Sequence, residues 1–275
     1  MDLTKTIGLG IAGNFAKHLE QAKESDDFIN VEVDEKDAPK GIFPFYLPSS
    51  KTFLGTYPLS SEKIVPPQYE ANLHMEPELA LWCEVSYNGN LISDLTPLKF
   101  TAFNDCTIRR DGANKISQKK NWGANSKGVS TSFIDIDKFE NGGILDSYQI
   151  ASFLRRGDRF EAYGVDSPIL GYTYFYEKLK NWLINKLNSQ KDSNPLENIS
   201  EYLNELSQPK NLLISIGATA YTEFGENGFL RSKDEIFVCI YNNKIYTKEQ
   251  IHTMIKDGDT SSKSGLSLLH QKIKD

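Results

Sequence analysis

The stretch that decides the fold runs from residue 72 to residue 90 and reads NLHMEPELALWCEVSYNGN. Its segment 78–87 is apolar and β-leaning, and Asn88-Gly89 is a strong signal for a two-residue hairpin turn. Residues 90–93 then form the return, and residues 98–106 are a further apolar run of β character. The sequence therefore predicts a hairpin followed by more strand, which favours a β-rich domain.

Carboxylates mark the ends of these runs. Glu76 and Glu78 open the first strand, and side chains at positions i and i+2 of a strand point to the same face. Asp105 ends the second run 27 residues after Glu78, so neighbouring strands would bring all three together. Close carboxylates repel unless they are protonated, hydrogen-bonded or bound to a cation. The ordinary alternative is a group of acidic residues at an exposed strand end.

Three hard oxygen ligands without histidine or cysteine suit Mg²⁺, Mn²⁺ or Ca²⁺ and do not suit zinc. If the three carboxylates converge, we expect a site for one of these ions.

The bulk composition excludes several classes of protein. The 275 residues carry a net charge of −6, with a pI of about 5.4, and show no basic stripe for nucleic acid. Cys83, Cys106 and Cys239 are widely spaced, which favours a reducing compartment. The N-terminal stretch lacks the features of a signal peptide, and no apolar run is long enough to cross a membrane. We expect a soluble, cytoplasmic protein that binds neither nucleic acid nor membranes.

Gly8, Gly10 and Gly13 match the pattern GxGxxG, which occurs in dinucleotide sites. We reject that interpretation because at most two or three strand residues precede the glycines and no βαβ unit follows. A tight turn before a helix near residues 14–23 is the better prediction.

Hydrophobic periodicity predicts the remaining elements. Helices are expected at residues 172–187 and 196–206, strands near 132–136, 159–163, 212–216 and 235–241, and a polar, frayed tail after residue 257.

Six segments, in order along the chain, resemble the fumarylacetoacetate hydrolase superfamily. They are NFAKHLEQ (14–21), IFPFYLPSS (42–50), NLHMEPELAL (72–81), FNDCTIRRD (103–111), NWGANSKG (121–128) and LLISIGATAYTEFGENGFLRSKDEI (212–236). The resemblance implies an α+β, mainly β fold: a mixed β-sandwich or roll with peripheral helices. It divides the chain into an N-terminal segment with a lid helix (1–40), a catalytic domain (41–257) and a polar tail (258–275). By analogy with the family we also expect a homodimer.

The resemblance assigns roles around the metal. Glu76, Glu78 and Asp105 become its ligands, with Mg²⁺ as the first choice and Mn²⁺ or Ca²⁺ as alternatives. Arg109 matches an arginine that clamps the substrate carboxylate, although Arg110 is adjacent in a basic loop. Lys127 matches the family lysine near the metal, but it falls one residue late, and Lys119 and Lys120 are nearby alternatives.

The lid and the closing loop depart from the family pattern. His18 matches the water-activating histidine, yet Gln21 stands where the family has glutamate, which leaves Glu20 or Glu24 as possible partners. The family's closing GTP motif reads Gly217-Ala218-Thr219 here, so Thr219 or Tyr221 would contact the substrate. In addition, Leu47 replaces a lysine that is frequent in the family.

These assignments imply an enzyme that acts on a small oxo-acid or 1,3-dicarbonyl compound through a metal-stabilised enolate. Hydrolysis or decarboxylation is the leading expectation. A lyase, isomerase or tautomerase without water attack is the alternative, and Gln21 favours it. A catalytically idle family member with a binding role is a third hypothesis.

Overall fold

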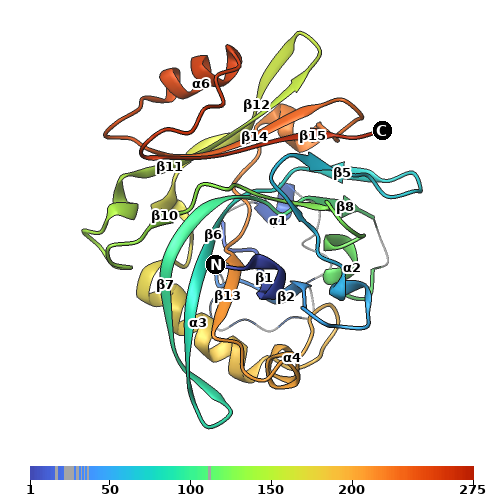
Figure 1. Ribbon diagram of the computed structural model, residues 1–275, viewed down its shortest axis with the longest axis vertical. Helices are drawn as coiled ribbons and strands as arrows, with labels where there is room; N and C mark the ends of the chain where they lie inside the picture. Colours follow the sequence, from blue (N-terminus) through green and yellow to red (C-terminus); the bar gives the residue numbers. More distant parts are fainter. Residues whose placement is uncertain are drawn as a thin grey trace.

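Two β-sheets and a small two-stranded ribbon form the protein. The computed structural model describes residues 1–15, 18–21, 28, 31, 33, 35, 37–110 and 113–275, with the backbone alone at residues 18 and 19. Figure 1 shows the five-stranded sheet at the top and the larger sheet curled below it.

The larger sheet has eight strands. Their spatial order is β2 (Gly41–Tyr46), β1 (Ile7–Ala12), β13 (Asn211–Ser215), β6 (Pro77–Asn88), β7 (Leu91–Asn104), β9 (Lys127–Val129) and β3 (Leu59–Ser60), and β10 (Ile134–Asp135) also pairs with β7. Strands β1 and β13 run parallel, and β6 pairs with both β13 and β7 in the antiparallel sense. The predicted hairpin around Asn88-Gly89 is confirmed.

The smaller sheet covers one end of the larger one. Its order is β12 (Arg159–Pro168), β11 (Tyr148–Arg156), β14 (Glu235–Asn242), β15 (Leu266–Ile273) and β4 (Lys63–Ile64), while β5 (Asn72–His74) and β8 (Thr107–Arg109) form the ribbon. Leu269 and Ile273 of β15 and Ile150 of β11 belong to the same buried core as Leu79 and Phe100 of the larger sheet. The two sheets therefore share one core.

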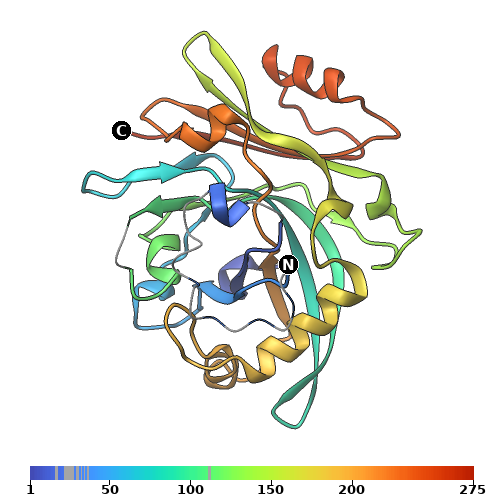
Figure 2. The same cartoon turned by 180° about the vertical axis from the view of Figure 1, so that it is seen from behind.

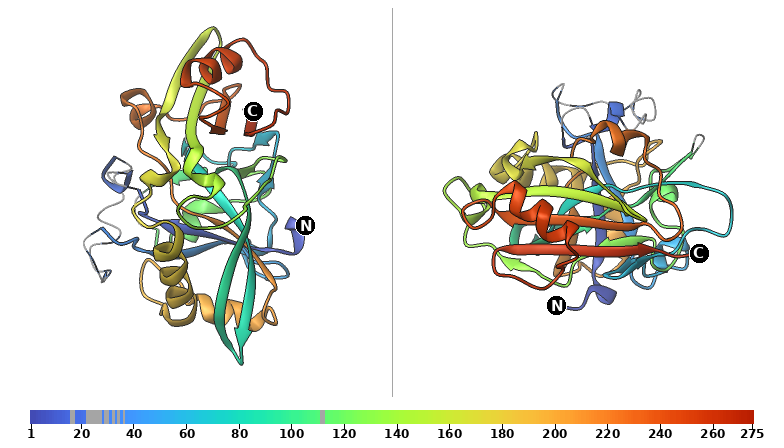
Figure 3. Two further views of the ribbon diagram at one scale, coloured as in Figure 1. Left: turned by 90° about the vertical axis from the view of Figure 1, so that its left-hand side faces the viewer. Right: turned by 90° about the horizontal axis from the view of Figure 1, so that it is seen from above.

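Helices lie on the outside. They are α1 (His18–Gln21), α2 (Ser117–Lys120), α3 (Tyr176–Ser189), α4 (Ile199–Glu205), α5 (Glu223–Asn227) and α6 (Lys248–Lys256). Helix α3 buries Leu179 and Leu183 in the main core and lies across the curled sheet, as Figure 2 shows. Helix α6 packs Ile251 and Ile255 against the smaller sheet, at the far end of the molecule from α3 and α4 (Figure 3). The predicted mixed β fold with peripheral helices is confirmed. No helix in the described part of the chain is both long and apolar enough to cross a membrane.

The prediction of a turn at the glycine triplet is wrong for Gly8 and Gly10. Both lie inside β1, whose six residues are all buried, and only Gly13 has the positive φ of a turn, at 76°. The rings of Phe45 and Phe43 occupy the space where side chains at Gly8 and Gly10 would stand. Glycine here makes room for the phenylalanines of β2, which is why the strand is hard to recognise in the sequence.

Replacing Gly8 with alanine should lower the free energy of unfolding by about 1–3 kcal/mol, because the new methyl group overpacks the core. Its Cβ would lie 2.1 Å from a Phe45 ring carbon. Urea unfolding measures the loss, and the double variant Gly8→Ala/Phe45→Leu should recover part of it. A single variant as stable as the wild type would contradict this close packing.

The expected frayed tail is also wrong for residues 266–273. These residues form β15, which pairs with β14 over seven positions and with β4 at its end. Gln271 is fully buried, and its side chain bonds Asn104, Ser60 and Lys63. Ser267 and Gln271, two of the polar residues that suggested a tail, are thus buried and hydrogen-bonded.

Candidate metal centre

The β6–β7 hairpin brings the three predicted carboxylates together. Glu78 lies on β6 opposite Phe103 of β7, and the backbone amide of Asp105 donates to the carbonyl of Glu76 at 2.9 Å. One carboxylate oxygen from each residue lies within 4.8 Å of the others, and all three residues are buried. The alternative of an exposed acidic strand end is therefore wrong.

Burial has a marked effect on Glu78. Desolvation raises the pKa of its carboxyl well above 4.5, and the negative charges of Asp105 and Glu76 raise it further. Lys120 and the backbone amide of Gly217, which donates to Glu78 Oε2 at 2.9 Å, offset part of this effect. A bound cation would favour the ionised form of Glu78 more strongly.

Three cationic side chains face these carboxylates. Arg109 Nη2 lies 2.8 Å from Glu76 Oε1, and Lys120 Nζ lies 2.6 Å from both Glu76 Oε2 and Asp105 Oδ2. Lys127, from β9, contacts Asp105 Oδ1 and donates to the carbonyl of Cys106 at 3.2 Å. Burial lowers the pKa of Lys127, and Asp105 partly offsets this. Among the described contacts, these three basic groups pair with Glu76 and Asp105, and with Glu78 included the formal charges of the six groups sum to zero when all are ionised.

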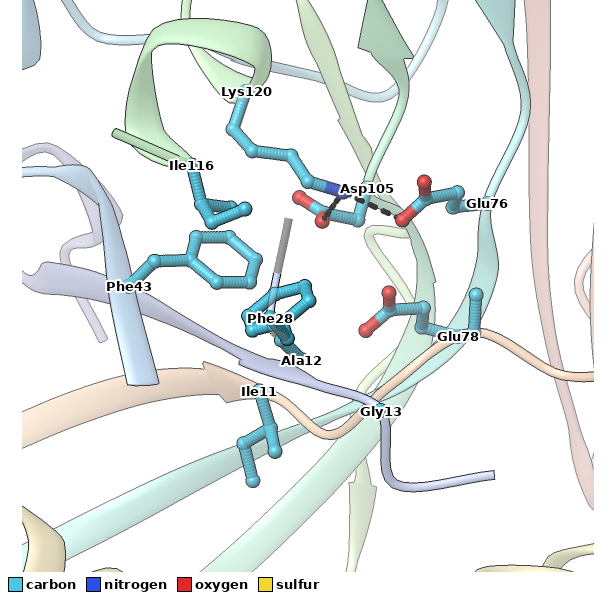
Figure 4. A pocket seen from close by; sticks show the side chains of 11 residues that line it. Ile11, Ala12, Gly13, Phe28, Phe43, Glu76, Glu78, Asp105, Ile116 and Lys120 are labelled. Carbon is cyan, nitrogen blue, oxygen red and sulfur yellow. Dashed lines mark hydrogen bonds and ion pairs between the residues drawn. The ribbon is translucent and has the colours of Figure 1, made fainter. Parts of the chain in front are cut away.

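Two of the three sequence candidates for the lysine, Lys127 and Lys120, lie at the centre. Lys127 contacts Asp105 despite its shifted position in the motif, and Lys120 adds a second contact to the same carboxylate. Figure 4 shows the Lys120 side chain pointing between Asp105 and Glu76, while Ile116 and Phe43 stand beside it.

Arg109 is held from two further directions. Its Nε donates to His74 Nδ1 at 3.2 Å, and its Nη2 donates to the Tyr221 hydroxyl at 3.2 Å. The Tyr221 hydroxyl in turn donates to the carbonyl of Met75 at 3.0 Å. His74 Nε2 lies 2.6 Å from the carbonyl of Gly225, so Nε2 carries the proton and Nδ1 accepts from Arg109. Sequence analysis did not single out His74, although it lies two residues before Glu76 in the same motif.

The side chain of Asn14 holds the start of the closing loop, which contains Gly217, by hydrogen bonds. The Asn14 amide donates to the carbonyls of Tyr174 and Ile216, and its oxygen accepts from the backbone of Tyr174. Gly217 follows with φ 110°, a conformation that favours glycine, and its amide faces Glu78. Thr219 is buried, and its backbone amide donates to the carbonyl of Pro77 at 3.2 Å. This loop therefore shapes one side of the carboxylate site.

Gln21 joins α1 to the closing loop. Its amide nitrogen donates to the carbonyl of Tyr221 at 3.2 Å, and its amide oxygen accepts from the Tyr221 amide at 2.9 Å. Glu20 is exposed. The side chain of His18 and the whole of residue 24 lie outside the described residues, so the predicted base and one of its candidate partners remain predictions. A glutamate at position 21 could not donate the first of these bonds.

Helix α2, which carries Lys120, lies beside a buried acid. Burial raises the pKa of the Glu197 carboxyl to about 7, although Ser117 and Lys115 lower it in part. The folded protein thus holds this proton more tightly than the unfolded chain, whose glutamates titrate near 4.5. The resulting stabilisation is fully present below about pH 4.5 and is lost as the pH rises through 7.

The Glu197→Gln variant should therefore be more stable than the wild type at pH 8, by about 3 kcal/mol at most, and nearly equal to it at pH 5. Urea unfolding at both pH values measures the difference. A difference that does not change with pH would show that Glu197 is ionised throughout this range.

The donor set fits a hard divalent cation. Two ligands of one ion cannot lie farther apart than twice the metal–oxygen distance, about 4.2 Å for Mg²⁺ and about 4.6–5.2 Å for Ca²⁺. One oxygen from each carboxylate lies within 4.8 Å of the others, a separation that a small closure of the side chains would bring within reach of one such ion. The cavity beside the carboxylates measures about 20 Å³, which is room for one ion or water molecule.

Comparison with solved structures places the fold. The protein Cg1458, solved with an inhibitor, matches with a TM-score of 0.55 and 15% identity over 98% of this chain and 77% of that one. A 2-keto-3-deoxy-D-arabinonate dehydratase, complexed with magnesium and 2,5-dioxopentanoate, matches at 0.53 and 16% identity over 98% and 72%. Yeast ynq8, a fumarylacetoacetate hydrolase family protein, matches at 0.52 and 14% identity over 99% and 95%. At these identities the likeness establishes the fold alone.

Comparison by sequence identifies one family. No curated protein matches the chain. The model of a family of unknown function, DUF5718, matches residues 24–273, which is most of the chain. The chain therefore belongs to the family of unknown function DUF5718, and its fold is that of the fumarylacetoacetate hydrolase proteins.

Proposed function

We propose that this protein is a divalent-metal-dependent enzyme that hydrolyses or decarboxylates a small oxo-acid or 1,3-dicarbonyl compound. The observation that carries the proposal is the convergence of Glu76, Glu78 and Asp105 in one buried pocket. Burial and the neighbouring carboxylates raise the pKa of Glu78, and perturbed acids in a cavity are typical of functional sites. The complex of the dehydratase neighbour with magnesium and a dioxo compound supports this choice of cofactor and substrate class.

A divalent ion held by these carboxylates would act as a Lewis acid toward the two oxygens of a dicarbonyl substrate. Residues of the chain would supply the other interactions with the substrate. Lys127 and Arg109 supply positive charge where negative charge develops on the substrate. Phe43, Phe28 and Ile116 form an apolar wall of the cavity that the acids line (Figure 4).

The size of the cavity restricts the substrate. A space of about 20 Å³ holds no oxo-acid, so the apolar wall must move outward when one binds. Thr219 and Tyr221 are buried behind this site, and Tyr221 already contacts Arg109. We propose that both residues contact the substrate in the opened form, where Arg109 pairs with its carboxylate.

A second candidate is a lyase, isomerase or tautomerase that needs no water nucleophile. The hydrogen bonds of Gln21 favour it, because both polar ends of the amide bond the backbone of Tyr221. An amide in this arrangement offers a histidine no carboxylate partner and raises its basicity little. Water activation by His18 then depends on another acid.

Metal analysis and a substrate screen test the proposal together. The purified protein should contain about one equivalent of Mg²⁺, Mn²⁺ or Ca²⁺, or take it up after dialysis. A panel of 1,3-diketo acids and 2-oxo diacids, assayed with Mg²⁺ and with a chelator, should reveal metal-dependent turnover. Release of two acids indicates hydrolysis, release of CO₂ indicates decarboxylation, and loss of water or an isomer indicates the second candidate. If the protein binds metal but turns over no compound of the panel, the result would favour the third hypothesis, a catalytically idle family member with a binding role.

A further inference from the structure

Every oxygen of two of the three proposed ligands already faces a cation. Glu76 Oε1 lies 2.8 Å from Arg109, and Asp105 Oδ1 contacts Lys127. The other two oxygens, Glu76 Oε2 and Asp105 Oδ2, each lie 2.6 Å from the same atom, Lys120 Nζ. Lys120 is thus the one cation among these three that bridges both carboxylates.

The position of this ammonium matches that of a metal ion. An ion that binds Glu76 and Asp105 through these oxygens lies about 2.0–2.6 Å from each. Nζ of Lys120 lies 2.6 Å from both oxygens, so an ion that binds them from the same side would displace the ammonium, because two cations cannot remain together there. Among the contacts that the structure describes, withdrawal of Lys120 removes one from each carboxylate at once, whereas withdrawal of Arg109 or Lys127 removes one from a single carboxylate.

The site is built to hold the lysine in place. Only 4% of the Lys120 side chain is exposed, and its ammonium lies 5.3 Å from the centre of the Phe43 ring. Both acids are equally buried, so the bridge lies in a low-dielectric region where the attraction is strong. The bridge therefore offsets the repulsion between the two carboxylates without a metal ion.

We propose that Lys120 is a built-in competitor of the divalent metal, whose ammonium joins Glu76 to Asp105 and must leave before an ion binds both. The inference rests on the proposed metal site. It adds that metal binding exchanges one cation for another, so the wild-type protein binds metal more weakly than its three carboxylates alone would. The folded state then tolerates loss of the metal.

Two variants test the exchange. Lys120→Met removes the ammonium and keeps an apolar stem, and Lys120→Gln keeps a hydrogen-bond donor of similar length without the charge. Mn²⁺ serves as the probe, with affinity measured by calorimetry and by its electron paramagnetic resonance signal after chelation and dialysis. Both variants should bind Mn²⁺ about tenfold more tightly than wild type, or better, since a competing charge is gone.

Thermal unfolding gives an independent readout. Without metal, Lys120→Met should unfold at a lower temperature than the wild type, and saturating Mn²⁺ should raise its midpoint by more than it raises that of the wild type. If Lys120→Met does not fold without metal, the affinity of Lys120→Gln decides.

Lys119→Met is the matched control, because it removes a positive charge at the adjacent, equally buried position of α2. Its Mn²⁺ affinity should change less than that of the Lys120 variants. Equal affinity in the wild type and both Lys120 variants, or an equal gain in Lys119→Met, would overturn the bridge while leaving the metal enzyme intact. Absence of Mn²⁺ binding in every protein would overturn the proposed metal function, and this inference with it.

Discussion

Replacing Asp105 with asparagine should weaken Mn²⁺ binding by at least about a hundredfold and lower the free energy of unfolding by about 3–5 kcal/mol. The amide keeps the shape of the side chain but removes its charge, so one ligand becomes neutral. Asp105 also contacts two buried lysines, Lys120 and Lys127. Lys127 would then have no carboxylate beside it among the contacts that the structure describes, which is the costly outcome for a buried ion pair.

Calorimetry with Mn²⁺ and urea unfolding at pH 7 measure the two effects separately. Asp135→Asn is the control, because Asp135 also pairs with a lysine, Lys99, but at the surface. That change should cost less than about 1 kcal/mol and leave metal binding unchanged. An Asp105→Asn protein with wild-type metal affinity would remove Asp105 from the ligand set, whatever its stability.

Replacing Arg109 with alanine should reduce kcat/KM for the substrate found in the screen by about a hundredfold to a thousandfold. Arg109 holds Glu76 Oε1, the Tyr221 hydroxyl and His74 at once, so its loss disturbs both the metal side and the closing loop. It also supplies the positive charge that we assign to the substrate carboxylate.

Arg110→Ala is the matched control, since it removes the same group one residue further along. Arg110 is exposed, and its guanidinium donates to the carbonyl of Gln118 at 3.3 Å. The change should leave kcat/KM within about threefold and stability within about 0.5 kcal/mol. Urea unfolding distinguishes the variants even without a known substrate, because only Arg109→Ala leaves the buried Glu76 short of one cation. Similar losses in both variants would mean that the loop needs basic charge rather than this one contact.

The hairpin and the acidic triad could be predicted from the sequence because local signals specify both. Gly89 and Asn90 form the two-residue turn after Asn88, and two register shifts, at Ser86/Tyr87 and Trp82/Cys83, lie between this turn and the strand ends that carry Glu78 and Asp105. The helices at 176–189 and 199–205 have periodic apolar faces, so their existence was also predictable.

Strands β1 and β15 could not be predicted, because residues far away in the sequence stabilise their extended, buried conformation. Gly8 is a poor strand former until the Phe45 ring fills the space above it. Gln271 is typical of an exposed tail until Asn104 and two backbone carbonyls bond its side chain. A tertiary contact reversed the local preference in each case.

The site shows the same limit. The sequence offered three lysines near the carboxylates and could not show that Lys120 and Lys127 contact them, since the position of Lys120 depends on the orientation of a four-residue helix. The substitution at Gln21 was visible in the sequence, yet its two bonds to Tyr221 arise only when residues 200 positions apart meet.

The parallel pairing of β1 with β13 has a consequence for synthesis on the ribosome. Ile7 cannot pair with Leu212 until Leu212 has been translated, and at about 5–20 residues per second this takes roughly 10–40 s. During that time the buried face of β1 and the free edge of β6 have no partner from β13. These strand edges therefore stay unpaired until β13 emerges, and Gln271, whose side chain accepts a hydrogen bond from Asn104, is translated later still.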